Sequence, residues 1–231
     1  MEKTKVKLSE LQTEKRWNFS VFSSASQKAH EALNKLRYPV LLLKEIVKKT
    51  ERGFSEIQKI TSAEGIPLLS LECIKPEGVV IRNANKFISL EEHRKLYKSA
   101  VKRNDILVAL SIRPNMNISA VYESDYPANL TSYLAKLELN ERVYPHYLSL
   151  FLNSSLGKEL IQQKAIGSIR PSINISHLLE LPVPLPPLHE QKILVEAVQN
   201  KQIKALELQK EAVKLIEEAS QLIETFFTNK Q

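Results

Sequence analysis

The sequence of 231 residues is poor in the residue types on which many enzyme sites depend. It has one cysteine, Cys73, which excludes an internal disulfide and a cysteine-based zinc cluster and is typical of a reducing cytosol. Its five glycines are isolated, so the chain has no P-loop and no dinucleotide-binding fingerprint. The five histidines lack metal-ligand spacing, and we therefore expect no catalytic residue, no metal site and no cofactor in this chain.

Long apolar runs are also missing. No stretch approaches the roughly 20 apolar residues that a helix needs to cross a bilayer. The first residues, MEKTKVKLSELQTEKR, lack the apolar core of a signal peptide. Apolar residues make up 43% of the chain, which is normal for a soluble fold with one buried domain and an extension, or with two small domains. We expect a cytoplasmic protein with no membrane partner.

Charge is plentiful and unevenly distributed. The formal net charge is +7, but the residues from Leu188 onward contain six lysines and seven glutamates. The excess of positive charge therefore lies before Leu188, as a phosphate-binding surface requires. Because basic surfaces also occur in proteins that bind no nucleic acid, charge alone does not decide between these possibilities.

A long helix is predicted at the C-terminus. Four prolines, Pro182, Pro184, Pro186 and Pro187, remove backbone donors, so any strand there lies at a sheet edge and a new helix starts near Leu188. No glycine or proline follows for about 40 residues, which corresponds to a rod of roughly 60 Å. Apolar residues recur at intervals of seven along one side of this rod, and alanines on its central line favour close approach of a partner helix. The residues expected to face the partner are Leu194, Val198, Ala205, Leu208, Ala212, Leu215, Ala219, Leu222 and Phe226. Packing of this side on the protein's own domain is the alternative.

The part before this helix has the pattern of an α+β fold. Strands are predicted at 67–74, 78–81, 86–88, 105–112, 118–122 and 128–139, the run at 105–112 being central. Helices are predicted from Tyr144 and over 157–165. Short strands followed by helices, without regular alternation, indicate one mixed α/β domain over residues 38–187. An N-terminal arm over 1–37, with an aromatic cluster at 17–22, docks either on this domain or on a partner.

Six short motifs follow one another in a recognisable order. They are Asn104-Asp105-Ile106-Leu107-Val108, Ile112-Arg113-Pro114-Asn115, Ala128-Asn129-Leu130-Thr131, Tyr147-Leu148 with Asn153-Ser154, Gly167-Ser168-Ile169-Arg170, and Leu181 to Leu188 with Glu190-Gln191. This order resembles that of type I restriction-modification specificity subunits. The proline-rich segment that runs into a Glu-Gln helix is the most specific part, and the resemblance extends from Tyr38 to the C-terminus.

The resemblance implies a target recognition domain that reads one half of a bipartite double-stranded DNA site, followed by a long coiled-coil spacer helix over 188–231. Full-length members carry this unit twice, whereas this sequence has it once and resembles a half subunit. The implied partners are a second copy or a different half subunit, a methyltransferase subunit and a restriction subunit. S-adenosylmethionine and ATP are then expected in partner subunits, and the implied role is DNA methylation and defence against foreign DNA.

Candidate DNA contacts come from physical chemistry, because recognition domains differ in their base-reading loops. Long polar side chains on exposed loops reach bases, and lysine and arginine contact phosphates. Three groups qualify: Lys48, Lys49 and Arg52 on a predicted basic turn; Arg113, Asn115 and Asn117 on a loop; and Lys164, Ser168 and Arg170 on a third segment. Two other functions stay open. A coiled-coil scaffold would bind no specific DNA, and a stand-alone nuclease would need metal-binding carboxylates, which leave only faint marks in a sequence.

Overall fold

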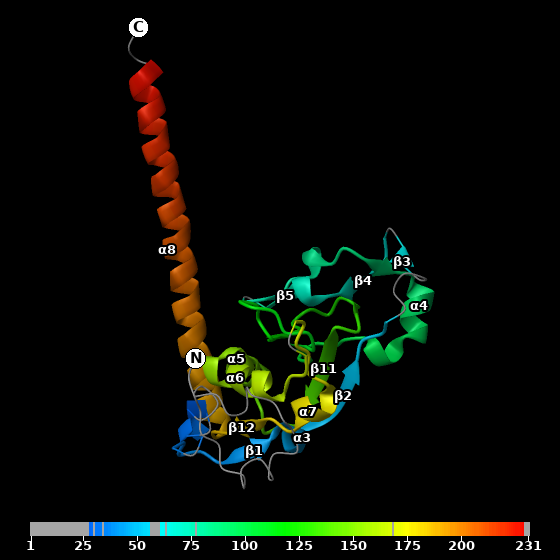
Figure 1. Cartoon of the computed structure of the whole chain (residues 1–231). Helices are drawn as coiled ribbons and strands as arrows, with labels where there is room; N and C mark the ends of the chain where they lie inside the picture. Colours follow the sequence, from blue (N-terminus) through cyan, green and yellow to red (C-terminus); the bar gives the residue numbers. More distant parts are fainter. Residues whose placement is uncertain are drawn as a thin grey trace. The chain divides into compact units, whose positions relative to one another are not determined.

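The structure is a computed structural model that describes residues 28–29, 31–33, 35–55, 61–62, 64–76, 78–167 and 169–228 (Figure 1). The chain divides into two compact units, Met1–Leu188 and His189–Gln231. Strands and short helices make up the first unit, and one long helix makes up the second, which confirms the α+β fold class. Residues 1–27 of the predicted N-terminal arm, with its aromatic cluster, lie outside the described residues, whereas Ala29 and Leu33 at the end of the arm are buried in the core of the first unit.

The main sheet of the first unit has four antiparallel strands in the order β2-β11-β8-β9. Their bounds are β2 (Val47–Arg52), β11 (Leu134–Leu139), β8 (Ile106–Ala109) and β9 (Ser119–Val121). Figure 1 shows β11 beside β2, and β11 pairs with β8 along its other edge. Every residue of β8 is buried, as its apolar run predicts, and the strand lies between β11 and β9, which confirms its central position.

A second, mixed sheet has the order β10-β4-β7-β3. It contains β10 (Asn129–Leu130), β4 (Ile66–Leu69), β7 (Phe87–Ile88) and β3 (Thr61–Ser62), and β10 runs parallel to β4. The short helical segments α4 (Leu90–Lys95), η3 (Leu71–Cys73), η4 (Ile81–Asn83) and η5 (Tyr97–Ser99) and the hairpin β5 (Ile74–Lys75) and β6 (Gly78–Val79) complete this region. The buried amide of Asn129 donates to Leu96 O at 3.0 Å and to Ser99 Oγ at 2.7 Å, which attaches the segment after α4 to β10.

Two of the predicted strands are wrong in extent. The run 128–139 forms two strands in different sheets, because a turn closed by the bond from Leu134 N to Thr131 O, 2.9 Å, separates β10 from β11. The run 67–74 stops as a strand at Leu69, and the next residues form the turn η3, in which Cys73 N donates to Ser70 O at 3.0 Å. Most apolar residues of both runs are buried, with Tyr133 in the turn as an exposed exception, so hydrophobicity alone does not reveal the turns.

The proline-rich segment forms an edge strand, as predicted. β12 (Pro182–Pro184) pairs antiparallel with β1 (Val40–Leu42), and Leu185 N donates to Pro39 O at 2.8 Å. The residues of this segment whose N–H and C=O groups face β1 alternate with the prolines. The prolines, which have no N–H group, therefore occupy the positions that face away from the partner strand. The Tyr147 hydroxyl donates to Pro184 O at 2.6 Å on that other side.

The helices of the first unit cover the apolar core of the main sheet. They are α3 (Leu43–Ile46), α5 (Pro145–Asn153), α6 (Ser155–Lys164) and α7 (Ile175–Leu179). Pro145 occupies the first turn of α5, where its missing donor costs nothing. Leu148, Leu152 and Ile161 from α5 and α6 are fully buried against Ile106 and Val108 of β8 in one cluster.

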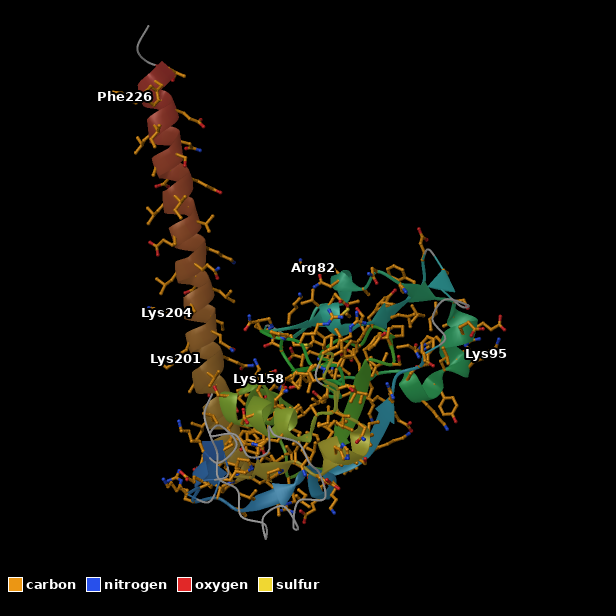
Figure 2. All side chains as sticks on the ribbon, in the orientation of Figure 1. Arg82, Lys95, Lys158, Lys201, Lys204 and Phe226 are labelled. Atoms are coloured by element: carbon orange, nitrogen blue, oxygen red, sulfur yellow. The ribbon has the colours of Figure 1, made fainter. Side chains whose placement is uncertain are left out.

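The second unit is the helix α8 (Leu188–Thr228), which has 41 residues and begins where the prolines end. Every residue from 201 to 228 is exposed. Among the residues predicted to face a partner helix, Leu208, Leu215, Leu222 and Phe226 are between 55% and 73% exposed. Side chains project from all sides of this helix in Figure 2, with Phe226 near its C-terminal end.

Candidate nucleic-acid interface

A cleft of about 850 Å³ opens in the first unit between a loop, a helix and a returning segment. These are the loop 112–117 after β8, one face of α6, and the residues 169–171. Three basic side chains line the cleft, Arg113, Lys158 and Arg170, against one carboxylate, Glu159. The other lining residues are Ser111, Ile112, Pro114, Asn115, Met116, Ile118, Tyr133, Ser155, Gln162, Ile169 and Pro171. The surplus of positive charge makes this a favourable place for phosphate.

Backbone pairing brings the two lining segments together although about 60 residues separate them in the sequence. Ser111 and Ser172 form an antiparallel bridge, and Ile112 N donates to Pro171 O at 2.9 Å. One step further on, Ile173 N donates to Leu110 O at 2.9 Å. The segment after α6 therefore pairs with the residues that follow β8. This pairing brings Arg113 and Arg170 into the lining of the same cleft.

The loop 112–117 is a tight turn that displays polar side chains. Asn115 has a φ of 57°, a left-handed conformation that asparagine tolerates better than most residues. Arg113 Nη1 lies 3.5 Å from Glu72 Oε1, yet the arginine side chain stays 61% exposed. The Ser70 hydroxyl, 2.6 Å from Glu72 Oε2, and the Arg113 guanidinium lower the pKa of Glu72, so this carboxylate is ionised beside the arginine.

The far end of the loop is bound to β8 by the bond from Ala109 N to Ile118 O, 2.7 Å, and to α5 by side-chain contacts. Asn153 Oδ1 accepts from Ile118 N at 2.7 Å and from Ser119 N at 3.2 Å, and Asn153 Nδ2 donates to Ser119 O at 2.8 Å. One turn earlier on α5, Ser149 O and Ser149 Oγ each lie 3.2 Å from Ser119 Oγ. The start of β9 is thus bound to α5 by polar contacts.

The helix α6 presents one face to the cleft. Ser154 caps it by accepting from Gly157 N at 3.1 Å, and the helix starts sharply because Gly157 has no side chain: a Cβ there would lie 2.1 Å from Phe151 O. Ser155, Lys158, Glu159 and Gln162, which are three or four residues apart, line the cleft. Lys158, labelled in Figure 2, was missed at the sequence level, although the helical spacing that carries it was visible.

The predicted DNA contacts divide into those that line the cleft and those that lie elsewhere. Arg113, Asn115 and Arg170 line it together. Asn117 belongs to the same loop but not to the lining, and Ser168 lies outside the described residues. Lys164, at the end of α6, forms an ion pair with Glu180 at 3.4 Å.

The predicted basic turn at Lys48, Lys49 and Arg52 is wrong, because all three residues belong to strand β2. Pairing with β11 extends this segment as a strand despite its charges. Lys48 forms an ion pair with Glu141 at 3.0 Å, and Lys49 one with Glu51 at 3.6 Å. Arg52 Nε donates to Ser132 O at 2.8 Å. Their contact with DNA stays a prediction.

Asp105 and Lys136 form a pair of ionisable side chains just before β8 and on β11 in the main sheet. Asp105, 2% exposed, accepts from Lys102 N at 2.9 Å and lies 4.0 Å from Lys136 Nζ. Burial raises the pKa of Asp105 and lowers the pKa of Lys136, because each charge has left water. The Asn104-Asp105 motif is therefore a structural corner, in which Asn104 has a φ of 70°.

The described part of the chain lacks the features of two other kinds of site. It contains no group of three or more histidine, cysteine, aspartate or glutamate side chains placed to hold a metal ion. None of the helices described has the length and apolarity needed to cross a membrane.

Similar proteins agree with this architecture. A curated relative, the specificity subunit of the type I restriction enzyme EcoBI from Escherichia coli, is 27% identical over 137 residues, which are 59% of this chain and 28% of that protein. The crystal structure of the HsdS subunit from Thermoanaerobacter tengcongensis matches 87% of this chain and 49% of its own, with 16% identity and a TM-score of 0.55. A chain from a structure on complex assembly and conformational transition of the type I R-M system matches 86% of this chain and 49% of its own, with 17% identity and a TM-score of 0.59.

The likeness to these two structures confirms the fold. The chain spans about half the length of each of them. The family model described as "Type I restriction modification DNA specificity domain" matches residues 37–218, which include the main part of the first unit and most of α8. That match covers well over half of the sequence. The chain therefore belongs to the family of type I restriction-modification DNA specificity domains.

Proposed function

We propose that this chain binds double-stranded DNA through the cleft and directs methyltransferase and restriction subunits to one half of a bipartite site. The family gives the DNA-specificity role. The observation that carries the assignment to this face is the convergence of Arg113, Lys158 and Arg170 around one cleft. Most protein–DNA hydrogen bonds go to phosphates and sugars, and basic side chains supply many of them.

The residues of the cleft divide by chemistry. Arg113, Lys158 and Arg170 are placed to contact phosphates and set the position of the domain on the duplex. Asn115, at the tip of the loop, has the amide that pairs with the edge of an adenine in the major groove. Lys48, Lys49, Arg52, Asn117 and Lys164 are secondary candidates, because they do not line the cleft.

Catalysis belongs, in this proposal, to partner subunits. The chain itself neither methylates nor cuts DNA, and S-adenosylmethionine and ATP bind to the methyltransferase and restriction subunits. The family of DNA specificity domains supports this division of labour.

Pairing of α8 with a helix of a second chain is part of the same proposal. Exposing the long apolar side of α8 to water costs free energy. The large apolar residues between 208 and 226 are each more than half exposed. The partner is either a second copy, which would pair antiparallel by two-fold symmetry, or a different specificity chain.

The test is methylation sequencing of a host that expresses the methyltransferase subunit with or without this chain. We expect one bipartite motif to be methylated only when the chain is present. Methylation of the same positions without the chain, or methylation by the purified chain alone, would overturn the proposal.

A further inference from the structure

We infer that Asn153 is a positioning residue for DNA sequence selectivity, because its side chain sets the conformation of the loop 112–117. This inference rests on the proposed function. Asn153 does not line the cleft itself. It acts through Arg113 and Asn115, which the loop carries.

The two ends of the loop are fixed in different ways. At its start, the bond from Ile112 N to Pro171 O joins backbone to backbone, so no side-chain substitution removes it directly. At its end, Ile118 N and Ser119 N both donate to the side chain of Asn153. This end also has backbone bonds, because Ile118 O accepts from Ala109 N at 2.7 Å and Ser119 pairs with Val108 in the main sheet. One substitution at Asn153 therefore removes the acceptor of two backbone amides and loosens this end of the loop, while its start stays bound.

The contact is well protected from water. Ile118 and Ser119 are 3% and 1% exposed, so their N–H groups have no easy replacement for the lost acceptor. The side chain uses both ends of its amide, because Nδ2 also donates to Ser119 O at 2.8 Å. This third bond fixes the orientation of the amide and therefore the direction in which Oδ1 accepts.

A loop held at both ends presents its side chains in one arrangement, which favours one base sequence over others. A loop loosened at one end still carries the same charges. Loss of Asn153 is therefore expected to reduce the preference for the correct sequence while leaving the general attraction to phosphate in place, because base contacts specify and phosphate contacts position.

The experiment compares affinities for two duplexes. The full chain first selects its preferred sequence from a pool of duplexes with a randomised central segment. The affinity for that selected duplex is then divided by the affinity for a scrambled duplex of equal composition. Asn153→Ala is expected to lower this ratio by about fivefold or more, the loss of at least one base contact. Its affinity for the scrambled duplex is expected to stay within about twofold of the original.

The matched control is Asn140→Ala. Asn140 also ties backbone segments together, because Nδ2 donates to Glu45 O at 3.2 Å and Oδ1 accepts from Arg142 N at 3.1 Å, but it lies outside the cleft lining. A purely structural effect of losing such an amide lowers stability in both variants. Only Asn153→Ala is expected to change the affinity ratio.

Asn153→Asp supplies a second variant in case the alanine variant does not fold. Aspartate keeps an acceptor for Ile118 N and Ser119 N but loses the donor to Ser119 O. In this variant we expect the protection of the two amides against hydrogen exchange and the affinity ratio to behave alike. Both stay as in the original chain, or both fall. A change of one without the other, or an unchanged ratio in a folded Asn153→Ala variant, would overturn the inference. If the original chain selects no sequence at all, the proposed function has failed instead.

Discussion

At the scale of residues, the proposed DNA binding depends on the positive charge of the cleft. We predict that the double charge reversal Lys158→Glu and Arg170→Glu weakens DNA binding strongly. Each lost phosphate contact also reduces the slope of log affinity against log salt by about one, so the slope should fall by about two. Fluorescence anisotropy with a labelled duplex over a range of salt concentrations measures both effects.

The matched control for this pair reverses Lys48 and Lys164. These lysines form ion pairs with Glu141 and Glu180 and do not line the cleft, while the change in net charge is the same. We expect a smaller loss of affinity and a nearly unchanged slope. Equal effects of the two double variants would mean that net charge, and not the cleft, governs binding.

Tyr147 gives a prediction about pH. Burial raises its pKa to about 12, and the hydroxyl donates to Pro184 O. An unfolded tyrosine has a pKa of about 10, so its folded form contributes stability that is full below about pH 10 and is lost as the pH rises toward 12. The contribution of this one group to the free energy of unfolding falls by up to about 1.4 kcal/mol per pH unit in that window.

Tyr147→Phe should remove this group's contribution to the change of the free energy of unfolding with pH. It should also cost about 1–2 kcal/mol at pH 8, because Pro184 O loses its donor. Urea unfolding of both proteins at pH 8, 10 and 11.5 measures the difference. Tyr97→Phe, at a position 67% exposed, is the control and should follow the original protein throughout. Identical pH dependence in Tyr147→Phe and the original protein would contradict the role assigned to this hydroxyl.

At the scale of elements, the close approach of α5 and α6 depends on Gly157. A Cβ at this position would lie 2.1 Å from Phe151 O and 2.9 Å from Leu152 Cα, and both atoms belong to the backbone. We predict that Gly157→Ala destabilises the fold by at least about 2 kcal/mol. Ser155→Ala, at an exposed position in the same turn, should change stability by less than about 0.5 kcal/mol. Urea midpoints measure both, and equal midpoints for the two variants would show that the turn relaxes easily.

The sequence was sufficient for those elements whose signals are local. The prolines defined the start of α8, and the uninterrupted run after Leu188 defined its length. Pro145 marked the start of α5, and the apolar run 106–109 marked the buried central strand. In each case one stretch of sequence contained the physical cause.

Elements that depend on partners could not be predicted in this way. The strand β2 contains two lysines and one arginine, and its sequence predicts a turn. Only the pairing with β11 shows that it is a strand. Likewise, Arg113 and Arg170 were predicted on separate segments, and their meeting depends on the bridge between Ser111 and Ser172. Lys158 is absent from the predicted contacts, because only the folded structure shows that its helix lines the same cleft as Arg113 and Arg170.

At the scale of the whole molecule, the proposed pairing with a second chain depends on α8. We predict that the chain forms a complex through this helix and that Ala212→Glu with Ala219→Glu dissociates it, because an uncompensated buried charge costs several kcal/mol. Lys210→Glu with Gln221→Glu adds charge to the opposite side of the helix and should leave assembly unchanged. Light scattering of the purified chains gives the mass of each. Two results would count against pairing with a second copy. One is a complex that persists after Ala212→Glu with Ala219→Glu, and the other is an original chain that is monomeric without partner subunits.

If the cleft of the first unit binds DNA, hydrogen exchange of the full chain with and without a saturating duplex locates the contact. We expect slower exchange on DNA binding in three segments, 111–118, 155–162 and 169–173, with little change in β1 and β12. Protection confined to other segments, with these three unchanged at saturating duplex, would contradict the proposed binding at the cleft.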